Sequence, residues 1–373
     1  MNRRNFLKTT GTAGVLTCSG LGSLLMDLHA FSQNANLSKI EARFYKKLPD
    51  REIECTLCPR SCKLGDKERG YCGVRENMDG TYYTLVYGKA CSMHIDPIEK
   101  KPLFHFLPSS NALSIATAGC NVNCKFCQNW EISQVRPEQI RHFDLPPEAV
   151  VLTAEKNSCP VIAYTYSEPV VFYEYMFDTA QMGRNKNIRS AVITGGHINP
   201  EPLMELMEVV DAIKVDLKAF SQDFYTDYVR GELQPVLDAI KVIAKSNVWL
   251  EIVYLVIPTL NDNLSEIRQL SRWILREIGP DVPIHFSRFQ PMYLLKNLPP
   301  TPISTLVKAH DVAKEEGLNY VYIGNVPGHK YENTICPSCH NTIIHRIQYH
   351  IQKIDLQEGN CEFCGNPIPG VWT

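Results

Sequence analysis

Three cysteines near the middle of the chain have a spacing that suits an iron-sulfur cluster. Cys120, Cys124 and Cys127 follow the pattern C-x3-C-x2-C, so one short loop can turn three thiolates toward one point. A [4Fe-4S] cube has an iron at each corner and thiolates are its usual ligands, so three thiolates leave one iron open. The pattern predicts a cluster that binds a substrate or cofactor there. The alternative is a zinc or disulfide loop with the same spacing.

This loop resembles the cluster loop of the radical S-adenosylmethionine (SAM) superfamily, in which an aromatic residue, here Phe126, precedes the third cysteine. The resemblance implies that SAM chelates the open iron and that the Phe126 backbone lies near its adenine. It also implies that one electron cleaves SAM to methionine and a 5'-deoxyadenosyl radical, which abstracts hydrogen from a substrate. The cofactor supplies this chemistry while the protein orients it and excludes water.

A second motif, Thr165-Tyr166-Ser167-Glu168-Pro169, resembles the Gly-Gly-Glu-Pro motif of the same superfamily, with Tyr166 and Ser167 in place of the glycines. The resemblance implies that Glu168 holds the amino group of SAM, for which a carboxylate is suited. The alternative is a glutamate that caps the following helix.

A third motif, Asp216-Leu217-Lys218, resembles the Asp-x-Lys of glycyl-radical activating enzymes, in which the lysine meets the SAM carboxylate. Asp216 and Lys218 are therefore predicted to bind SAM, on one face of a strand. A structural ion pair inside a barrel is the alternative. Residues 258–262 resemble a Val-Pro-Gly-x-x-Asp turn of the same enzymes, with Thr259 in place of the glycine.

From about residue 50 to the C-terminus the chain resembles the radical SAM member of the AmmeMemoRadiSam group, related to pyruvate formate-lyase activating enzymes. The segments that carry the resemblance are Cys55 to Cys72, Asp96 to Pro102, Gly119 to Trp130, Tyr164 to Pro169, Asp216 to Phe220 and Tyr322 to Val326. The resemblance implies hydrogen abstraction from a partner protein, by analogy only. It also implies a reductant protein of the flavodoxin or ferredoxin type.

Two further cysteine sets can each form a complete four-thiolate metal site. The first, with gaps of two, three and nine residues, fits zinc or an auxiliary iron-sulfur cluster, and two disulfides are the competing interpretation. The second consists of two C-x2-C pairs separated by 21 residues and is typical of zinc ribbons or rubredoxin-like iron sites, with zinc favoured. The sets are Cys55, Cys58, Cys62 and Cys72, and Cys336, Cys339, Cys361 and Cys364.

The elements that must position these residues alternate from about residue 111. Strands are predicted at 113–118, 160–165, 189–194, 211–217, 248–257, 283–289 and 319–324, and helices near 146–156, 169–184, 201–209, 233–246, 264–278 and 302–316. This alternation predicts an α/β fold, a partial (βα)6-type TIM barrel with catalytic groups at the C-terminal ends of its strands. His285 and Arg288 either line the substrate end or belong to the core.

The predicted organisation is a signal segment (1–32), a Cys-rich segment (50–110), the radical SAM barrel (111–326) and a zinc-ribbon-like appendage (331–373). Within the Cys-rich segment, 82–87 is predicted as a strand. The two prolines of 96–106 predict an irregular linker whose charges are either solvated or part of a site.

Arg3-Arg4, followed by Phe-Leu-Lys and an uncharged run, resembles a twin-arginine export signal. It predicts a periplasmic or membrane-anchored protein that meets the membrane only through this segment, with a cytoplasmic location as the alternative. The chain of 373 residues has a net charge of −2, which argues against nucleic acid as a partner. The competing functional class is an exported iron-sulfur electron carrier or metal-stabilised interaction protein without SAM chemistry.

Overall fold

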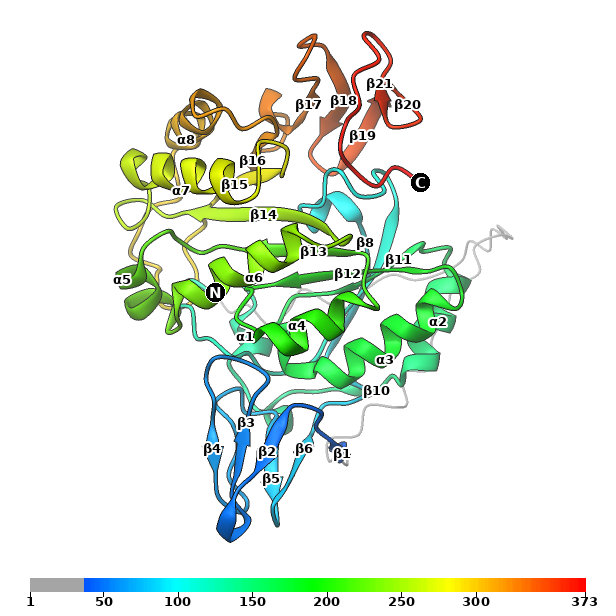
Figure 1. Cartoon of the computed structure of the whole chain (residues 1–373), viewed down its shortest axis with the longest axis vertical. Helices are drawn as coiled ribbons and strands as arrows, with labels where there is room; N and C mark the ends of the chain where they lie inside the picture. Colours follow the sequence, from blue (N-terminus) through cyan, green and yellow to red (C-terminus); the bar gives the residue numbers. More distant parts are fainter. Residues whose placement is uncertain (1–36) are drawn as a thin grey trace, which may run out of the picture.

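The computed structural model describes residues 37–373, and the predicted signal segment lies outside them. Its centre is an eight-stranded mixed sheet with the order β16-β15-β14-β13-β12-β11-β9-β8 (Figure 1). Seven strands are parallel, and β8 pairs with β9 antiparallel at one edge. The strands are β8 (Ser92–Pro97), β9 (Asn111–Ala116), β11 (Val161–Tyr164), β12 (Arg189–Thr194), β13 (Ala212–Asp216), β14 (Trp249–Val256), β15 (Ile284–Arg288) and β16 (Val321–Gly324).

Helices connect the parallel strands, as the alternation predicts. They are α1 (Trp130–Ser133), α2 (Pro147–Lys156), α3 (Tyr173–Arg184), α4 (Pro200–Met207), α5 (Gln222–Phe224), α6 (Leu233–Ala244), α7 (Leu264–Glu277) and α8 (Ile303–Glu315). Proline opens α2 and α4, and the Asn263 side chain accepts a hydrogen bond from Ser265 N at the start of α7. The seven predicted strands and six predicted helices are confirmed, which gives a mixed α/β fold with a parallel sheet. None of the described helices is long and apolar enough to cross a membrane.

The prediction of an irregular linker over 96–106 is wrong at its beginning. Asp96 and Pro97 end strand β8, in which Asp96 pairs with Ala112 of β9. Proline is tolerated there because β8 is an edge strand and Pro97 is its last residue. Three of the four charged residues of this run, Asp96, Glu99 and Lys101, are buried, and only Lys100 is exposed, so most of its charge is not solvated.

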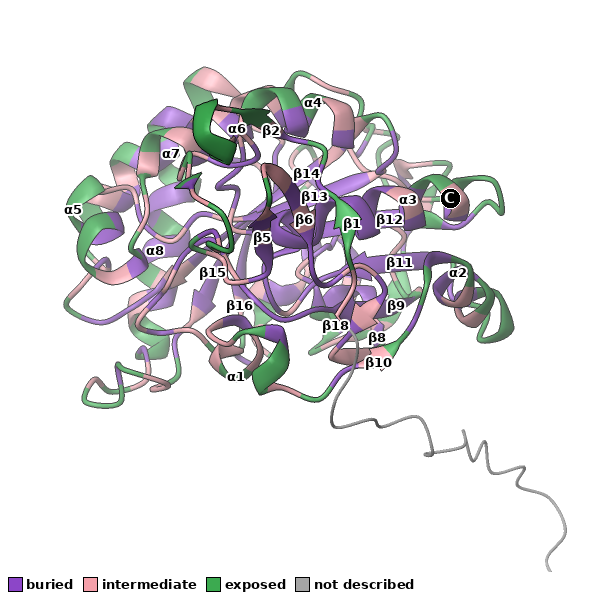
Figure 2. Cartoon of the chain, turned by 90° about the horizontal axis from the view of Figure 1, so that it is seen from below, coloured by how far each residue is buried: buried purple, intermediate pink, exposed green. Residues whose placement is uncertain are grey.

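The segment that follows β8 packs into one face of the sheet. Its apolar side chains form a small core with alanines on neighbouring strands, and Figure 2 shows that the interior of the sheet is buried. The members of this core are Ile98, Leu103, Phe106, Ala112, Val161, Ala163, Ala191, Ile193 and Ala212. The backbone N–H groups of Phe104 and His105 each donate to Glu251 Oε1 at 2.8 Å, which ties the segment to β14.

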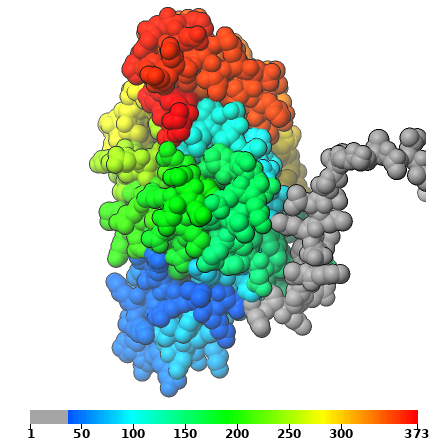
Figure 3. Space-filling view, turned by 90° about the vertical axis from the view of Figure 1, so that its right-hand side faces the viewer, coloured from blue at the N-terminus to red at the C-terminus, as the bar shows by residue number. Residues whose placement is uncertain are grey.

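Two small β-rich segments lie at opposite ends of the molecule, the N-terminal one in blue and the C-terminal one in red (Figure 3). The N-terminal segment contains β1 (Ile40–Glu41), β2 (Tyr45–Lys47), β3 (Ile53–Cys55), β4 (Lys63–Leu64), β5 (Arg75–Met78) and β6 (Thr81–Thr84), followed by β7 (Lys89–Ala90), which pairs with β10 (Phe143–Asp144). The strand predicted over 82–87 corresponds to β6, which starts one residue earlier and ends at Thr84.

The C-terminal segment contains β17 (Thr334–Ile335), β18 (Thr342–Ile347), β19 (His350–Ile354), β20 (Leu356–Gln357) and β21 (Asn360–Cys361). Arg346 on β18 is buried and donates to Phe104 O at 2.7 Å. This contact joins the C-terminal segment to the segment that fills the sheet.

Candidate active site

The three-cysteine loop follows β9 directly and is held by backbone hydrogen bonds. Gly119 opens it with a φ of +97°, a conformation that favours glycine. Asn123 N donates to Val229 O at 3.0 Å and Lys125 N donates to Tyr228 O at 2.8 Å, both in the short π-helix 225–229. The loop is therefore held against this π-helix, which follows β13 and α5 in the chain.

The structure brings the three cysteines together with charged groups from other strands. Burial raises the pKa of Cys120 far above its ordinary value and that of Cys124 to about 12, while Lys218 acts against the shift at Cys124. The Sγ of Cys127 lies 3.1 Å from Ser133 Oγ. All three are free thiols. Because a metal ligand must be a thiolate, such buried thiols would release their protons on binding metal.

Glu168 follows β11 and is buried among hydrogen-bond donors. Its Oε1 accepts from Thr194 Oγ1 at 2.6 Å and from Val170 N at 3.1 Å, and its Oε2 accepts from Gly195 N at 2.8 Å. Burial raises the pKa of Glu168, and these donors act against that shift. Glu168 thus caps the short helix Pro169–Phe172, as the structural alternative expects, and its carboxylate also joins the ends of β11 and β12.

Asp216, the last residue of β13, lies between two lysines. Its carboxylate accepts hydrogen bonds from Lys214 Nζ and, at 3.0 Å, from Lys218 Nζ. Burial would raise the pKa of Asp216, but the two ammonium groups overcome this effect and lower it to about 2. The alternation of a strand brings these side chains together, although Lys218 lies past the strand's end. The ion pair expected as the structural alternative is present, and it leaves a surplus positive charge beside Cys124.

Comparison with known proteins agrees with this geometry. The family model of the Radical SAM superfamily matches residues 114–274. An uncharacterized protein of Methanocaldococcus jannaschii is 46% identical over 330 residues, which cover 88% of this chain and 98% of that protein. This chain belongs to the radical SAM superfamily.

More distant similarities of this radical SAM protein include an activating enzyme. The pyruvate formate-lyase 1-activating enzyme of Escherichia coli (strain K12) is 25% identical over 165 residues, which cover 43% of this chain and 67% of the enzyme. The crystal structure of a domain of pyruvate-formate lyase-activating enzyme from Bacteroides vulgatus aligns with a TM-score of 0.40 at 15% identity, covering 44% of this chain and 98% of that domain.

The residues of this radical SAM protein fit the cofactors that its superfamily implies, a [4Fe-4S] cluster and SAM. One loop presents three free thiols. The anionic Glu168 and cationic Lys218 match the charges of the amino and carboxylate groups of SAM. Beside Glu168, the buried Ser167 Oγ has no hydrogen-bond partner among the described residues, so a polar ligand group can be received there. Phe126 is buried, with its ring 5.8 Å from that of Phe224.

A second polar cluster in this radical SAM protein includes charges of the 96–106 run, for which a site was one of two alternatives. The Tyr166 hydroxyl donates to Asp96, whose Oδ2 also accepts from Lys101 Nζ at 2.5 Å. The Tyr166 carbonyl accepts from Asn129 Nδ2 at 2.9 Å, which links the cluster to the three-cysteine loop. The charges of Asp96 and Lys101, close to apolar residues 102–104, were the sequence signal for this cluster.

The two residues predicted either to line the substrate end or to belong to the core, His285 and Arg288, both have partners within the protein. His285 Nε2 lies 2.6 Å from Glu251 Oε2, and both side chains are buried, as expected for a core histidine with its hydrogen bond satisfied. Arg288 donates through Nε to Thr301 O at 2.9 Å.

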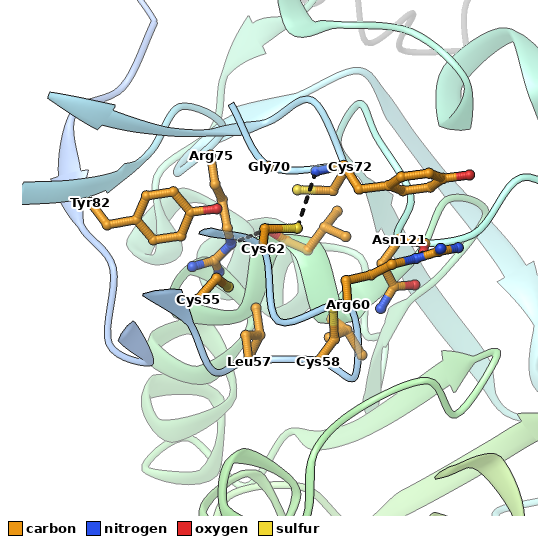
Figure 4. Close-up of a pocket in the computed structure, with 13 residues that line it drawn as sticks. Cys55, Leu57, Cys58, Arg60, Cys62, Gly70, Cys72, Arg75, Tyr82 and Asn121 are labelled. Carbon is orange, nitrogen blue, oxygen red and sulfur yellow. Dashed lines mark hydrogen bonds between the residues drawn. The ribbon is translucent and has the colours of Figure 1, made fainter. Parts of the chain in front are cut away.

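The two four-cysteine sets differ in geometry. In the C-terminal set, Cys336 Sγ lies 3.7 Å from Cys364 Sγ, Cys339 Sγ lies 3.7 Å from Cys361 Sγ, and all four sulfurs are within 4.8 Å of one another. This set could bind one metal ion. The N-terminal set instead lines a pocket between β3, β5 and the three-cysteine loop (Figure 4). Every cysteine that the structure describes is free, so neither set forms disulfides here.

Proposed function

We propose that this protein is a radical SAM enzyme that generates a 5'-deoxyadenosyl radical and uses it to abstract hydrogen from a substrate. The observation that carries the proposal is the meeting of three free thiols with Glu168 and the Asp216–Lys218 pair at the ends of adjacent parallel strands. The six βα units act in this proposal as a partial barrel around the site. The bound cluster supplies the electron that cleaves SAM.

In this proposal the protein's residues orient SAM and keep water out. Cys120, Cys124 and Cys127 hold three corners of the cluster and leave the fourth iron to SAM. Glu168 accepts hydrogen bonds from the SAM amino group, and Lys218 neutralises its carboxylate. Lys214 keeps Asp216 ionised, so that Asp216 in turn fixes the position of Lys218.

The test is anaerobic reconstitution of the full chain with iron and sulfide, followed by addition of SAM and dithionite and measurement of 5'-deoxyadenosine. Cys124→Ala is expected to abolish SAM cleavage. Cys159→Ala is the matched control, because Cys159 is also a buried cysteine but is not one of the proposed site residues. An unaltered rate of cleavage in Cys124→Ala would overturn the assignment. A stable cluster that transfers electrons but never cleaves SAM would favour the electron-carrier alternative.

The similarity to the activating enzyme of Escherichia coli supports a partner protein as the substrate. We further propose a protein of the flavodoxin or ferredoxin type as the reductant. We also propose that residues 1–32 direct export through the twin-arginine route, on the basis of Arg3-Arg4. A reporter fused to residues 1–32 should be exported, and replacement of both arginines by lysine should retain it in the cytoplasm. Equal export of both fusions would contradict the proposal.

A further inference from the structure

The sulfur atoms of the N-terminal set are spaced more widely than those of a site for a single metal ion. In a tetrahedral site with metal–sulfur bonds of about 2.3 Å, the sulfurs lie about 3.8 Å apart. The C-terminal set has this spacing, and among the residues that the structure describes it is the only group of three or more His, Cys, Asp or Glu residues with all ligand atoms within 4.8 Å of one another. No three sulfur atoms of the N-terminal set lie that close together, and neither do those of Cys120, Cys124 and Cys127. An iron-sulfur cluster requires this wider arrangement because irons and sulfides lie between the thiolates.

A glycine keeps the pocket open. A Cβ atom at Gly70 would lie 3.7 Å from Cys72 Sγ, 3.9 Å from Cys62 Sγ and 2.7 Å from Tyr82 Oη, so a side chain here would occupy the space between the thiols. Tyr71 N, next to Gly70, donates to Cys62 Sγ at 3.5 Å. Backbone at this position can therefore approach a bound cluster closely and donate to its sulfur ligands.

The segment that carries the N-terminal set lies against the three-cysteine loop on both sides of Cys120. Asn121, the next residue, lines the pocket with Cys58, and Arg60 Nε donates to Asn121 O at 2.9 Å. On the other side, a Cβ atom at Gly119 would lie 2.7 Å from Cys72 O. Gly119 and Asn121, which adjoin Cys120 in the chain, thus both lie against the segment that carries the N-terminal set.

We propose that Cys55, Cys58, Cys62 and Cys72 bind a second iron-sulfur cluster, which passes electrons to the cluster at Cys120, Cys124 and Cys127. This electron transfer, the relay, rests on the proposed function, because its acceptor is the SAM-binding cluster. Binding of the second cluster does not depend on that function. In this proposal electrons enter the second cluster from the side of the exposed Tyr71, whose ring lies 3.8 Å from the Arg60 guanidinium. A one-electron donor protein of the ferredoxin or flavodoxin class is oxidised there. The second cluster is reduced by that electron and reoxidised when the electron passes through the contact between Cys72 and Gly119, and no bond is made or broken.

The binding site is tested by counting acid-labile sulfide and iron in full-length protein reconstituted without oxygen. We expect about eight cluster irons in the wild type and about four in a Cys120→Ala/Cys124→Ala/Cys127→Ala variant, with matching sulfide. The complementary Cys62→Ala/Cys72→Ala variant should also keep about four, and only its remaining cluster should change its electron paramagnetic resonance spectrum on addition of SAM. Absence of labile sulfide from the first variant, with zinc or disulfides in its place, would overturn the site.

The relay is tested by following reduction of the SAM-binding cluster spectroscopically. In Cys62→Ala/Cys72→Ala, reduction by a reduced ferredoxin should be lost while reduction by dithionite, a small molecule, persists. Tyr71→Ala keeps all the cysteines and should retain both clusters while it slows only the ferredoxin reaction. Equal rates with ferredoxin in all three proteins would overturn the relay. If the wild type instead holds two clusters and cleaves no SAM, the proposed function fails and the second site stands.

Discussion

Tyr166 has an unusual backbone conformation whose cost is offset by its side chain. Its φ is +69°, at a position where the motif it resembles has glycine. A non-glycine residue in this region costs of order 1–3 kcal/mol. The Tyr166 hydroxyl offsets the cost through its bond to Asp96 and a contact of 3.2 Å with Lys101 Nζ. The missing glycine therefore does not mean that the local geometry has changed.

Removal of that hydroxyl tests this explanation. Tyr166→Phe should lower the free energy of unfolding by roughly 1–2 kcal/mol, because the hydroxyl bonds to a buried charge. It should also weaken SAM binding, since Tyr166 lies two residues before Glu168. Chemical denaturation and calorimetric titration with SAM measure the two effects. Tyr87→Phe is the control, because it removes a tyrosine hydroxyl that donates to Asp178 at 2.8 Å on another part of the molecule; SAM affinity that falls equally in both variants would contradict the explanation.

Thr259 shows the same strain without such compensation. Its φ is +67°, its side chain is exposed, and its backbone N donates to Asp262 Oδ1 at 2.9 Å. A β-branched residue is a poor fit for this conformation. Thr259→Gly should therefore raise the free energy of unfolding by up to roughly 1 kcal/mol, as measured by denaturant titration. Thr259→Ala, which keeps the Cβ atom, should gain less, and a destabilised glycine variant would contradict the argument.

At the scale of elements, the periodicity of apolar residues was sufficient to predict each strand or helix that buries a regular face. The seven parallel strands are short apolar runs separated by helices, and they could be predicted from the sequence. β8 could not, because it is an edge strand that ends in Asp96-Pro97 and its pairing with β9 depends on contacts across the chain. Lys214 was not predicted as a site residue, for a related reason. Its charge lies in a strand, and only the fold shows that the strand's alternation brings it to Asp216.

We expect the C-terminal strands to depend on their four cysteines for stability. These strands are two to six residues long, and such a segment gains much of its folding energy from a bound metal ion. Cys339→Ser should lose one metal ion per chain by elemental analysis, and amides of β18 should exchange faster with deuterium. Cys159→Ser should change neither measurement. Metal content and exchange that match the wild type in Cys339→Ser would show that this set has no structural metal.

At the scale of the whole molecule, His105 joins three parts of the chain. It belongs to the segment that fills the sheet, its Nδ1 lies 2.7 Å from Pro369 O near the C-terminus, and its Nε2 lies 2.6 Å from the Tyr322 hydroxyl on β16. A carbonyl oxygen only accepts, so Nδ1 carries the proton and Nε2 accepts from Tyr322. The neutral ring thus satisfies both contacts. Burial lowers the pKa of His105 from 6.5 to about 4, although Glu251 acts in the opposite direction.

This pKa predicts a loss of stability in acid. Between pH 6.5 and about 4 the unfolded chain binds a proton at His105 that the folded chain does not, so the free energy of unfolding falls as the pH falls. The slope approaches about 1.4 kcal/mol per pH unit, for a total of at most roughly 3 kcal/mol. His105→Asn, whose amide nitrogen can still donate toward Pro369, should be less stable at pH 7.5 but should lose less stability on acidification. Other acid-sensitive groups, including any bound cluster, affect both proteins alike, so the difference between their denaturation curves isolates His105. Parallel curves from pH 7.5 to 4.5 would mean that the junction between the sheet and the C-terminal segment does not depend on a neutral imidazole.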